Sequence, residues 1–524
     1  MLIIPFVIGL WIFIPDGILG HPMSDMADHF WGNRWFAQQL SQGRLPIHTQ
    51  STHFPEGGYH WHIDPIGGCL QLLTLWLPPH DAWHIGLFLQ LSAMGIVMAL
   101  YAHHKLRRLE LSIGLGLALV FSAHVLGLLH SGLSEYLGIG WLIGLMWTLD
   151  RHRSKQAGLL LGLCFWQAAP YGLLGALLVC HRTWRQPLQL LTIALISAVI
   201  ASPAIIAIQW TANHPEAAFQ MTEAAGWSPQ SLPSVDVFGW WMPGNWLHPN
   251  TPAFGNPGIL QAHSLSLTLV AILIWGLWNN AELRQKGFAQ WPIAILMLGP
   301  KLSLNRWMPL GGLFFLPMAL LYLPGLPTQA FHHPYHIAAI VLPMALIAAG
   351  QVLKNAPAWL QLILFITYVL ESTISPAGLF PARTPVPSSI DINGAVMDWP
   401  PDRHMPNRMY LLAHSYHQQP TYSGVSQWLS PCLLHSHEIK AALKELDDPR
   451  FRSLNRDQHH PIEIPAQTSH SWASCGFEHL LVHKSYLNPR ELEASREFFN
   501  SKLALPIFEN EEIIHYQMTN MTVE

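Results

Sequence analysis

Long apolar segments follow one another through the first 375 residues of the chain. A helix needs about 20 such residues to cross the hydrocarbon core of a bilayer, and several segments approach that length. We therefore predict a mainly α-helical membrane domain with roughly 10 to 12 spans. The candidate spans are Trp83–His103, Leu111–Gly127, Glu135–Leu149, Gly158–Cys180, Leu188–Trp210, Leu265–Trp278, Ala289–Gly299, Ile337–Gly350 and Leu360–Ile374.

Three further apolar segments differ from these spans. Residues 1–14 end at Pro15-Asp16 and have no basic residue before them, so we interpret them as a first span rather than a signal peptide. Ile66–Leu77 and Leu310–Leu323 are shorter and predict half-helices.

Charge divides the chain in two. Only 11% of the 524 residues are charged, less than half of the roughly 25% usual in soluble proteins. Residues 1–375 hold 15 Lys/Arg and 14 Asp/Glu, whereas the 149 residues of 376–524 hold 12 and 17. We predict a transmembrane domain over 1–375 and a soluble domain over 376–524. The net charge of -4 gives no reason to expect nucleic-acid binding.

The soluble domain has the pattern of a small α/β unit. Strand-like runs occur at Met409–Leu412, His479–His483 and Ile513–Tyr516, and helix-like runs at Glu438–Leu446 and Pro489–Leu503. Cys432 and Cys475 both lie here. A disulfide and two free buried thiols are equally compatible with their positions.

Basic residues predict the orientation. They cluster at 105–108, 151–155, 182–185 and 284–286, whereas the long loop 211–263 has none and the loop 21–64 has two. The positive-inside rule places the basic loops in the cytoplasm and the two long loops outside. Gly158–Cys180 must then cross twice or re-enter, with a turn at Ala169–Gly172. The parity places 376–524 on the outer side as well.

The first outer loop concentrates the acids of the membrane domain. Asp25 and Asp28 precede an amphipathic run whose apolar stripe is Trp31, Trp35 and Phe36, which suits a helix in the membrane interface. Asp25 would stand at the membrane surface as a general base for an acceptor hydroxyl. The alternative is that Asp25 and Asp28 cap the helix.

Several short motifs together resemble the GT-C superfamily of polytopic glycosyltransferases. The loop after the first span has an acidic residue and a helix ending in Gly. Then come Leu45-Pro46, Phe54-Pro55-Glu56-Gly57-Gly58 and Asp64-Pro65. Further matches are Ser131–Glu135, Ser234–Asp236 with Pro243 and His248-Pro249, Leu298–Pro300 before Leu323–Gly325, and Phe331–His336. Family members often have Arg-x-Pro-x-Arg where this chain has His332-His333-Pro334-Tyr335-His336.

The resemblance implies a glycosyltransferase that takes a sugar from a polyprenyl-phosphate-linked donor and gives it to an extracytoplasmic glycan, lipid or protein acceptor. Its catalytic carboxylate would be Asp25, with Asp28 beside it. The donor phosphate needs cations, and the outer face offers Arg34, Lys301 and Arg306. Lys301 and Arg306 can equally be interfacial anchors.

Histidines and tryptophans supply the remaining candidates. His60, His62 and Asp64 alternate, so an extended segment would direct all three to one side, as a divalent-metal site requires. Polar residues in a solvated loop would give the same pattern, and no cofactor is assigned. The other candidates for substrate binding are Glu135, Trp241, His248, His332, His333 and His336.

Two other function classes stay open. A multi-pass transporter or lipid flippase would use the same acids and histidines as a proton relay, although no internal repeat is evident. A non-catalytic scaffold could also retain the GT-C arrangement. The chain has no nucleotide-binding Gly-rich loop, which disfavours ATP-driven transport.

Overall fold

The computed structural model describes residues 1–21, 24–55, 57–212, 214, 265–285, 334–373, 381–387, 392–399, 405–421, 474–503 and 505–518. Two compact units divide the chain. The helical unit comprises Met1–His29, Ile63–Ile208 and Met221–Pro385, and the C-terminal unit comprises Phe30–His62, Gln209–Gln220 and Val386–Glu524. The C-terminal unit thus includes Phe30–His62, which is most of the first long loop. It also includes Val386–Glu524, which is nearly all of the charged C-terminal segment.

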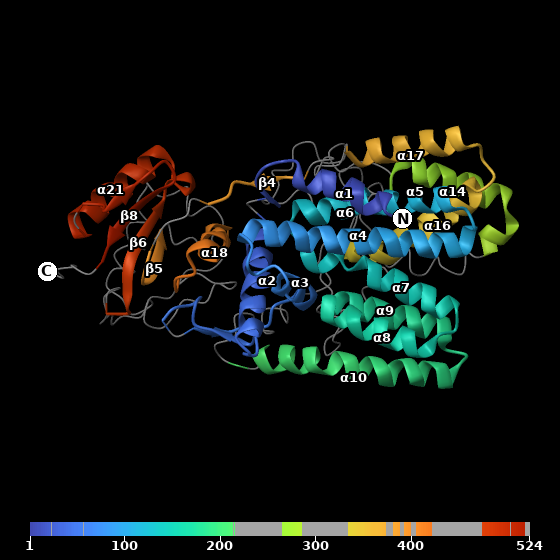
Figure 1. Cartoon of the computed structure of the whole chain (residues 1–524), viewed down its shortest axis with the longest axis horizontal. Coiled ribbons are helices and arrows are strands. Elements are labelled where there is room, and N and C mark those ends of the chain that lie inside the picture. Colours follow the sequence, from blue (N-terminus) through green and yellow to red (C-terminus); the bar gives the residue numbers. More distant parts are fainter. Residues whose placement is uncertain are drawn as a thin grey trace, which may run out of the picture. The chain divides into compact units, whose positions relative to one another are not determined.

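Helices form nearly all of the described helical unit, as the sequence predicts (Figure 1). Its helices are α1 (Ile3–Phe13), α3 (Pro65–Leu72), α4 (Pro79–Leu106), α5 (Leu109–Val120), α6 (Ala123–His130), η1 (Ser134–Leu137), α7 (Ile139–Asp150), α8 (Ser154–Gln167), α9 (Ala169–Thr183), α10 (Pro187–Ala212, ending in the other unit), α14 (Leu267–Asn279), η6 (Pro334–Ile337), α16 (Ala338–Leu353) and α17 (Ala358–Thr373). Strands β1 (Ile18–Leu19) and β4 (Arg383–Thr384) pair antiparallel.

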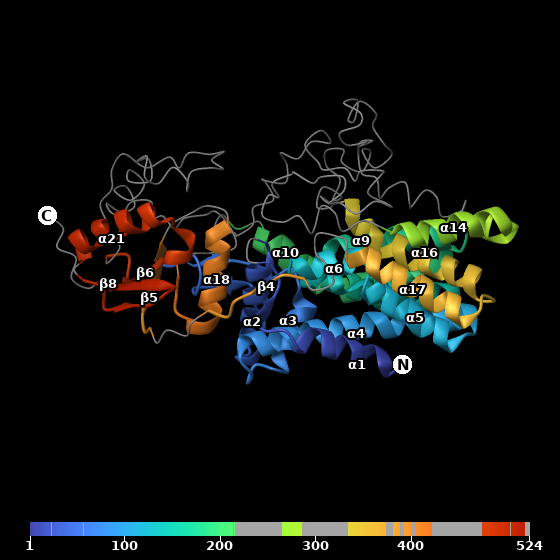
Figure 2. The same cartoon turned by 90° about the horizontal axis from the view of Figure 1, so that it is seen from above.

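Three segments of the described chain are long and apolar enough to cross a membrane. They are Pro79–Leu106, Leu109–His130 and Pro187–Thr211. The second includes both α5 and α6, which a break at Phe121–Ser122 separates. The helices α14, α16 and α17 pack together, and α16 and α17 also contact α5 (Figure 2). The predicted run Ala289–Gly299 lies outside the described residues, so the number of spans stays a prediction.

The segment Gly158–Cys180 forms two helices rather than one, as the distribution of basic residues requires. Helix α8 ends at Gln167, Ala168 is extended, and Pro170 occupies the first turn of α9. Proline suits that position because a first-turn residue needs no backbone N–H donor. Helices α8 and α9 pack against each other, so the predicted turn within this segment is confirmed, at Ala168 directly before Ala169–Gly172.

Basic residues from separate loops meet at one end of the helical unit. Asp150, the last residue of α7, is 2.7 Å from Nζ of Lys105 in α4 and also pairs with Arg182 in α9. The hydroxyl of Tyr101 donates to the same carboxylate at 2.7 Å. The predicted grouping of these loops on one side is therefore confirmed within this unit.

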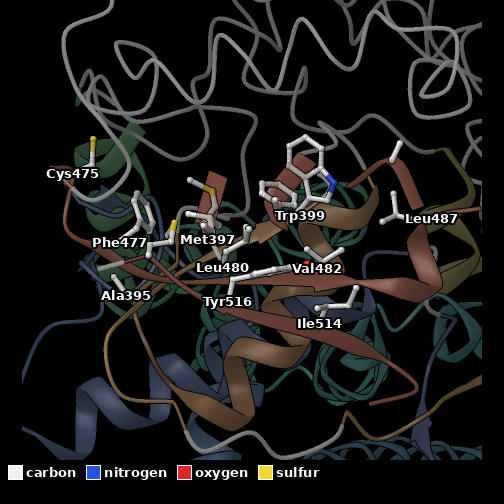
Figure 3. Close-up of a cluster of buried hydrophobic side chains, with 14 residues drawn as sticks. Ala395, Met397, Trp399, Cys475, Phe477, Leu480, Val482, Leu487, Ile514 and Tyr516 are labelled. Atoms are coloured by element: carbon white, nitrogen blue, oxygen red, sulfur yellow. The ribbon is translucent and has the colours of Figure 1, made fainter. Parts of the chain in front are cut away.

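A four-stranded sheet forms the described core of the C-terminal unit. Its strands are β5 (Ala395–Trp399), β6 (Phe477–His483), β7 (Phe508–Glu509) and β8 (Ile513–Gln517), in the order β5-β6-β8-β7. The β5–β6 pair is parallel and the others are antiparallel. Figure 3 shows the apolar side chains of one face, which include Trp399, Phe477 and Tyr516. The described unit also has α18 (Met405–His417), η8 (Lys484–Tyr486), α21 (Pro489–Leu503) and the short hairpin β2 (His48–Thr49) with β3 (Gly58–Tyr59).

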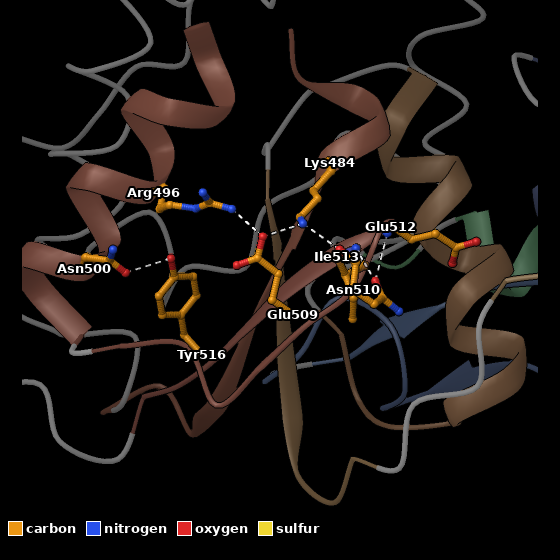
Figure 4. Close-up of polar contacts among 8 residues, drawn as sticks. All are labelled: Lys484, Arg496, Asn500, Glu509, Asn510, Glu512, Ile513 and Tyr516. Atoms are coloured by element: carbon orange, nitrogen blue, oxygen red, sulfur yellow. Dashed lines mark hydrogen bonds and ion pairs between the residues drawn. The ribbon is translucent and has the colours of Figure 1, made fainter. Parts of the chain in front are cut away.

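Polar side chains interact at the edge of this sheet that β7 forms (Figure 4). Lys484 Nζ is 2.5 Å from Glu509 Oε1, and Arg496 pairs with the same carboxylate. The Asn510 side chain accepts from the backbone N–H groups of Glu512 and Ile513, both at 2.8 Å, and so fixes the turn between β7 and β8.

The sequence predictions for the C-terminal unit are largely confirmed where residues are described. The strands near His479–His483 and Ile513–Tyr516 and the helix Pro489–Leu503 are present, whereas Glu438–Leu446 lies outside the described residues. The predicted strand at Met409–Leu412 is wrong because these residues belong to α18. Cys475 is disulfide-bonded, and its expected partner Cys432 lies outside the described residues.

The apolar stripe of α2 (Met26–Ser41) is buried in protein. Trp31, Trp35 and Phe36 form a cluster with Leu411 of α18 and are only 2–3% exposed. Trp31 Nε1 also donates to His414 Nδ1 at 3.0 Å. The prediction that this stripe lies in the membrane interface is therefore wrong: a period of 3.6 residues identifies a buried face but not what covers it.

Candidate active site

A buried acidic cluster lies in the helical unit at the end opposite the Asp150 group, since α7 separates the two. Its members come from the first turn of α2, the start of α3 and the turn before α7. They are Asp25, Asp28, His29, Asp64, Ser134 and Glu135.

Asp64 is the most highly connected residue of the cluster. It stands at the N-cap of α3, where its Oδ1 accepts from Gly67 N at 2.8 Å. Ser134 Oγ donates to Oδ2 at 2.5 Å, and Gln167 Nε2 donates to Oδ1 at 3.1 Å. Asp64 is 0% exposed. Three donors therefore stabilise its charge despite burial.

Gln167 extends this network into the helical bundle. Its Nε2 also donates to Gln90 Oε1 at 3.2 Å, while its Oε1 accepts from Trp141 Nε1 at 3.1 Å. Gly138 leaves the necessary room, since a Cβ there would lie 2.1 Å from Gln167 Cγ. Gln167 was not among the residues predicted for the site, although a glutamine inside an apolar run indicates a buried polar contact.

Glu135 and His29 form the centre of the cluster. His29 Nδ1 lies 3.2 Å from Glu135 Oε2, and the two side chains are 2% and 3% exposed. Burial lowers the pKa of His29 to about 3. Burial, together with the charge of Asp64, raises the pKa of Glu135 well above its ordinary value. Burial thus favours the neutral form of both partners.

The two first-loop aspartates occupy different environments. Asp25 directly precedes α2 and its carbonyl oxygen accepts from His29 N at 3.2 Å, so it holds the N-cap position that the capping alternative expects. Asp25 is half-buried. Asp28 is partly exposed as a residue, but its Oδ1 atom is buried, and this burial raises the pKa of the carboxyl group well above its usual range.

Close backbone packing brings the Ser131–Glu135 motif to α2. Gly132 has φ of +68°, and a Cβ on it would lie 2.5 Å from Met26 Cα. Only glycine satisfies both conditions without strain. Leu19 is fixed nearby, because its N–H donates to His84 Nε2 at 3.1 Å and its carbonyl accepts from Trp83 Nε1 at 3.0 Å.

His336 joins the cluster through Tyr136. Their rings stack with centroids 3.7 Å apart and planes 17° apart, and His336 is only 1% exposed. The hydroxyl of Tyr171 donates to the carbonyl of Tyr136 at 2.6 Å, which holds the turn that carries Glu135. The structure thus brings the predicted residues Glu135 and His336 together.

Other predicted residues belong to the C-terminal unit and pack within it. His62 Nε2 is 2.7 Å from Asn33 Oδ1, and His60 contacts the rings of Trp31 and Trp35. Arg34 is 9% exposed. Trp241, His248, Lys301, Arg306, His332 and His333 lie outside the described residues.

A metal site at His60, His62 and Asp64 is not supported. Asp64 uses its oxygens for Gly67, Ser134 and Gln167. Across the described part of the chain, no three His, Cys, Asp or Glu side chains are arranged to hold a metal ion.

Comparison with known proteins identifies the fold. The structure of the arabinofuranosyltransferase AftD from Mycobacteria matches 99% of this chain with a TM-score of 0.54 and 14% sequence identity. This chain has the GT-C fold. It spans 40% of the length of AftD. No protein-family model and no curated protein matches the sequence.

Two further structures with the GT-C fold match less closely. The archaeal oligosaccharyltransferase AglB from Archaeoglobus fulgidus, solved with an inhibitory peptide and a dolichol-phosphate, matches 92% of this chain and 69% of its own at 10% identity and a TM-score of 0.41. ArnT from Cupriavidus metallidurans, bound to undecaprenyl phosphate, matches 99% and 96% at 12% identity and a TM-score of 0.44.

Proposed function

We propose that this chain is a membrane glycosyltransferase that uses a polyprenyl-phosphate-linked sugar and glycosylates an extracytoplasmic glycan, lipid or protein. The observation that carries the proposal is the buried group His29, Asp64 and Glu135, with the half-buried Asp25 and Asp28 beside it at the start of α2. Four carboxyl groups gathered at one end of an apolar bundle cost considerable free energy and need a functional reason. The GT-C fold, shared with an arabinofuranosyltransferase, is consistent with such a site.

Asp25 is the proposed catalytic base because the residue is only half-buried while its backbone is fixed at the start of α2. It accepts the proton of the acceptor hydroxyl as that oxygen bonds to the anomeric carbon of the sugar. The bond from this carbon to the phosphate oxygen breaks, and its electron pair leaves with the polyprenyl phosphate. Burial raises the pKa of Asp28 and so favours its protonated form, which can donate a hydrogen bond.

The apolar helices offer a surface on which the polyprenyl chain of a lipid-linked donor can lie. A polyprenyl chain can lie against helices such as α10. In the most apolar stretch of this helix, only 22% of the residues are buried in protein. Its phosphate would reach the outer end of the bundle. Lys301 and Arg306, the cations proposed from the sequence, lie outside the described residues. The Lys105 and Arg182 end would face the cytoplasm of a bacterial cell.

A turnover assay tests the proposal. The purified chain in lipid nanodiscs is supplied with radiolabelled polyprenyl-phosphate pentoses and hexoses and with an envelope extract as acceptor. We expect at least one donor to give free polyprenyl phosphate together with a labelled acceptor. If no donor is consumed although the protein binds it, the chain is a scaffold. If the lipid only changes leaflet, the chain is a flippase.

A further inference from the structure

The Asp150 end of the helical unit contains a cavity of about 190 Å³ that lies far along the bundle from the acidic cluster. On the same measure one water molecule needs only about 10–15 Å³, so the cavity has room for a larger group. Its lining is mostly polar and consists of Leu149, Asp150, His152, Arg182, Thr183, Gln186 and Gln189.

Positive charge exceeds negative charge around this cavity. Asp150 pairs with both Lys105 and Arg182, so one carboxylate faces two cations. The turn between α7 and α8 adds the exposed Arg151 and Arg153. A guanidinium has five N–H donors, so Arg182 can bind Asp150 and an anionic ligand together. The amides of Gln186 and Gln189 supply further donors, and α10 begins at Pro187 with its positive pole here.

Aromatic side chains accompany the cations at this end. Lys105 lies over Tyr101 at 5.7 Å, Arg151 over Trp147 at 5.8 Å and Arg185 over Trp184 at 4.6 Å. Trp184 is 65% exposed. Tryptophan and tyrosine beside basic residues are typical of the level at which phospholipid headgroups lie. A membrane positioned by these side chains would bring its headgroup layer to the cavity.

Helix α10 has an exposed apolar face that begins beside the cavity. Leu188, Leu191, Leu195 and Val199 recur every three or four residues, so they share one face of α10. All four are more than half exposed. This face starts two residues after Gln186 and continues along the apolar helix, as the acyl chains of a lipid in the cavity would.

We propose that this cavity is a binding site for the phosphodiester headgroup of an anionic phospholipid, with the acyl chains along Leu188–Val199. The headgroup phosphate contacts Arg182 and the amides of Gln186 and Gln189. A zwitterionic lipid binds less well, because its ammonium or choline group would face the same cations. The proposal requires only that the chain is a membrane protein, and it is independent of the catalytic assignment.

Native mass spectrometry of the full chain in detergent tests this site with phosphatidylglycerol and phosphatidylcholine as probes. We expect the unmodified protein to prefer phosphatidylglycerol by about tenfold. The double change Gln186→Glu with Gln189→Glu should reduce phosphatidylglycerol binding about tenfold, because it places negative charge in the cavity. Gln156→Glu is the matched control, since Gln156 lies at the same end, contacts Arg153 and does not line the cavity. It should change binding less than about twofold.

Three results would overturn the proposal. They are equal binding of the two lipids, equal loss in the control and the double variant, and complete displacement of the lipid by excess inorganic phosphate. The last result would identify the site as one for free phosphate. If the double glutamate variant does not fold, Gln186→Ala with Gln189→Ala replaces it. That variant should still weaken phosphatidylglycerol binding about threefold, and unchanged binding would count against the site.

Discussion

The Nδ1 atom of His29 lies 3.2 Å from the Oε2 atom of Glu135, and the two side chains are 2% and 3% exposed. The pair joins the first turn of α2 to the turn before α7. Burial favours the neutral form of each partner, so the pair resists gaining a second proton at acidic pH and losing its only proton at alkaline pH.

Glu135→Gln should stabilise the protein increasingly as pH rises. The folded-state pKa of Glu135 is raised, so its contribution to stability is complete below about pH 4.5 and is lost as pH rises through the folded pKa. Glutamine resembles the protonated carboxyl and cannot ionise. The difference in thermal unfolding midpoint between variant and parent should therefore be larger at pH 8.5 than at pH 6.5. His29 adds no pH dependence in this range, because its contribution is lost only as pH falls from about 6.5 toward 3.

The exposed Glu110 provides the matched control for that experiment. Glu110→Gln should leave the midpoint difference the same at both pH values. An equal shift for Glu135→Gln at pH 6.5 and 8.5 would mean that Glu135 is already ionised in the folded protein.

Gly132→Ala should cost about 2 kcal/mol or more of stability. The positive φ of Gly132 is unfavourable for alanine, and the added Cβ would meet the backbone of Met26. Gly114→Ala is the control, because a Cβ there meets nothing within 4 Å and lies in helix α5. It should be neutral or stabilising. Unfolding by denaturant in mild detergent measures both, and similar values for the two variants would rule out the close approach of Gly132 to α2.

The features that the sequence predicted correctly depend on local pattern, and those that it did not predict depend on contacts between distant segments. Segment length and apolarity identified α4 and α10, and the positions of Arg151 and Arg182 required the α8–α9 turn. Periodicity could not identify the partner of the Trp31 stripe, because burial against Leu411 depends on contacts distant in sequence. The short run Met409–Leu412 was equally compatible with strand and helix.

The candidate site was only partly predictable for the same reason. Acidic residues are rare in the apolar domain, and this rarity identified Asp25, Asp64 and Glu135 as candidate site residues. Their contacts with His29, Ser134 and Gln167 arise from three segments that the fold brings together.

Leu411→Ala should destabilise the C-terminal unit by about 3 kcal/mol, because it opens a cavity beside Trp31, Trp35 and Phe36. Tryptophan fluorescence during unfolding should report the loss. Leu45→Ala, at a residue that is 75% exposed, is the control and should change stability little. If Leu411→Ala behaves like the control, the stripe of α2 does not pack against α18.

Asp398→Ala should cost about 3 to 5 kcal/mol, since it removes the partner of two buried donors. His483 Nε2 is 2.8 Å from Asp398 Oδ1, and Thr421 Oγ1 donates to Oδ2 at 2.7 Å. Glu509→Ala removes the exposed ion pairs of Figure 4 and should cost less than about 1 kcal/mol. Comparable costs for the two variants, measured by urea unfolding, would argue against a structural role for the Asp398–His483 pair.

Sugar transfer by the Asp25→Asn variant is the most direct test of the proposed catalytic role. With a polyprenyl-phosphate-linked donor that the unmodified chain uses, the variant should bind the donor with a similar Kd. Its transfer rate should fall by about 10² to 10⁴, the range of general base catalysis. Asp81→Asn, which alters an exposed aspartate at the start of α4, should keep both values. Full transfer by Asp25→Asn would contradict the account.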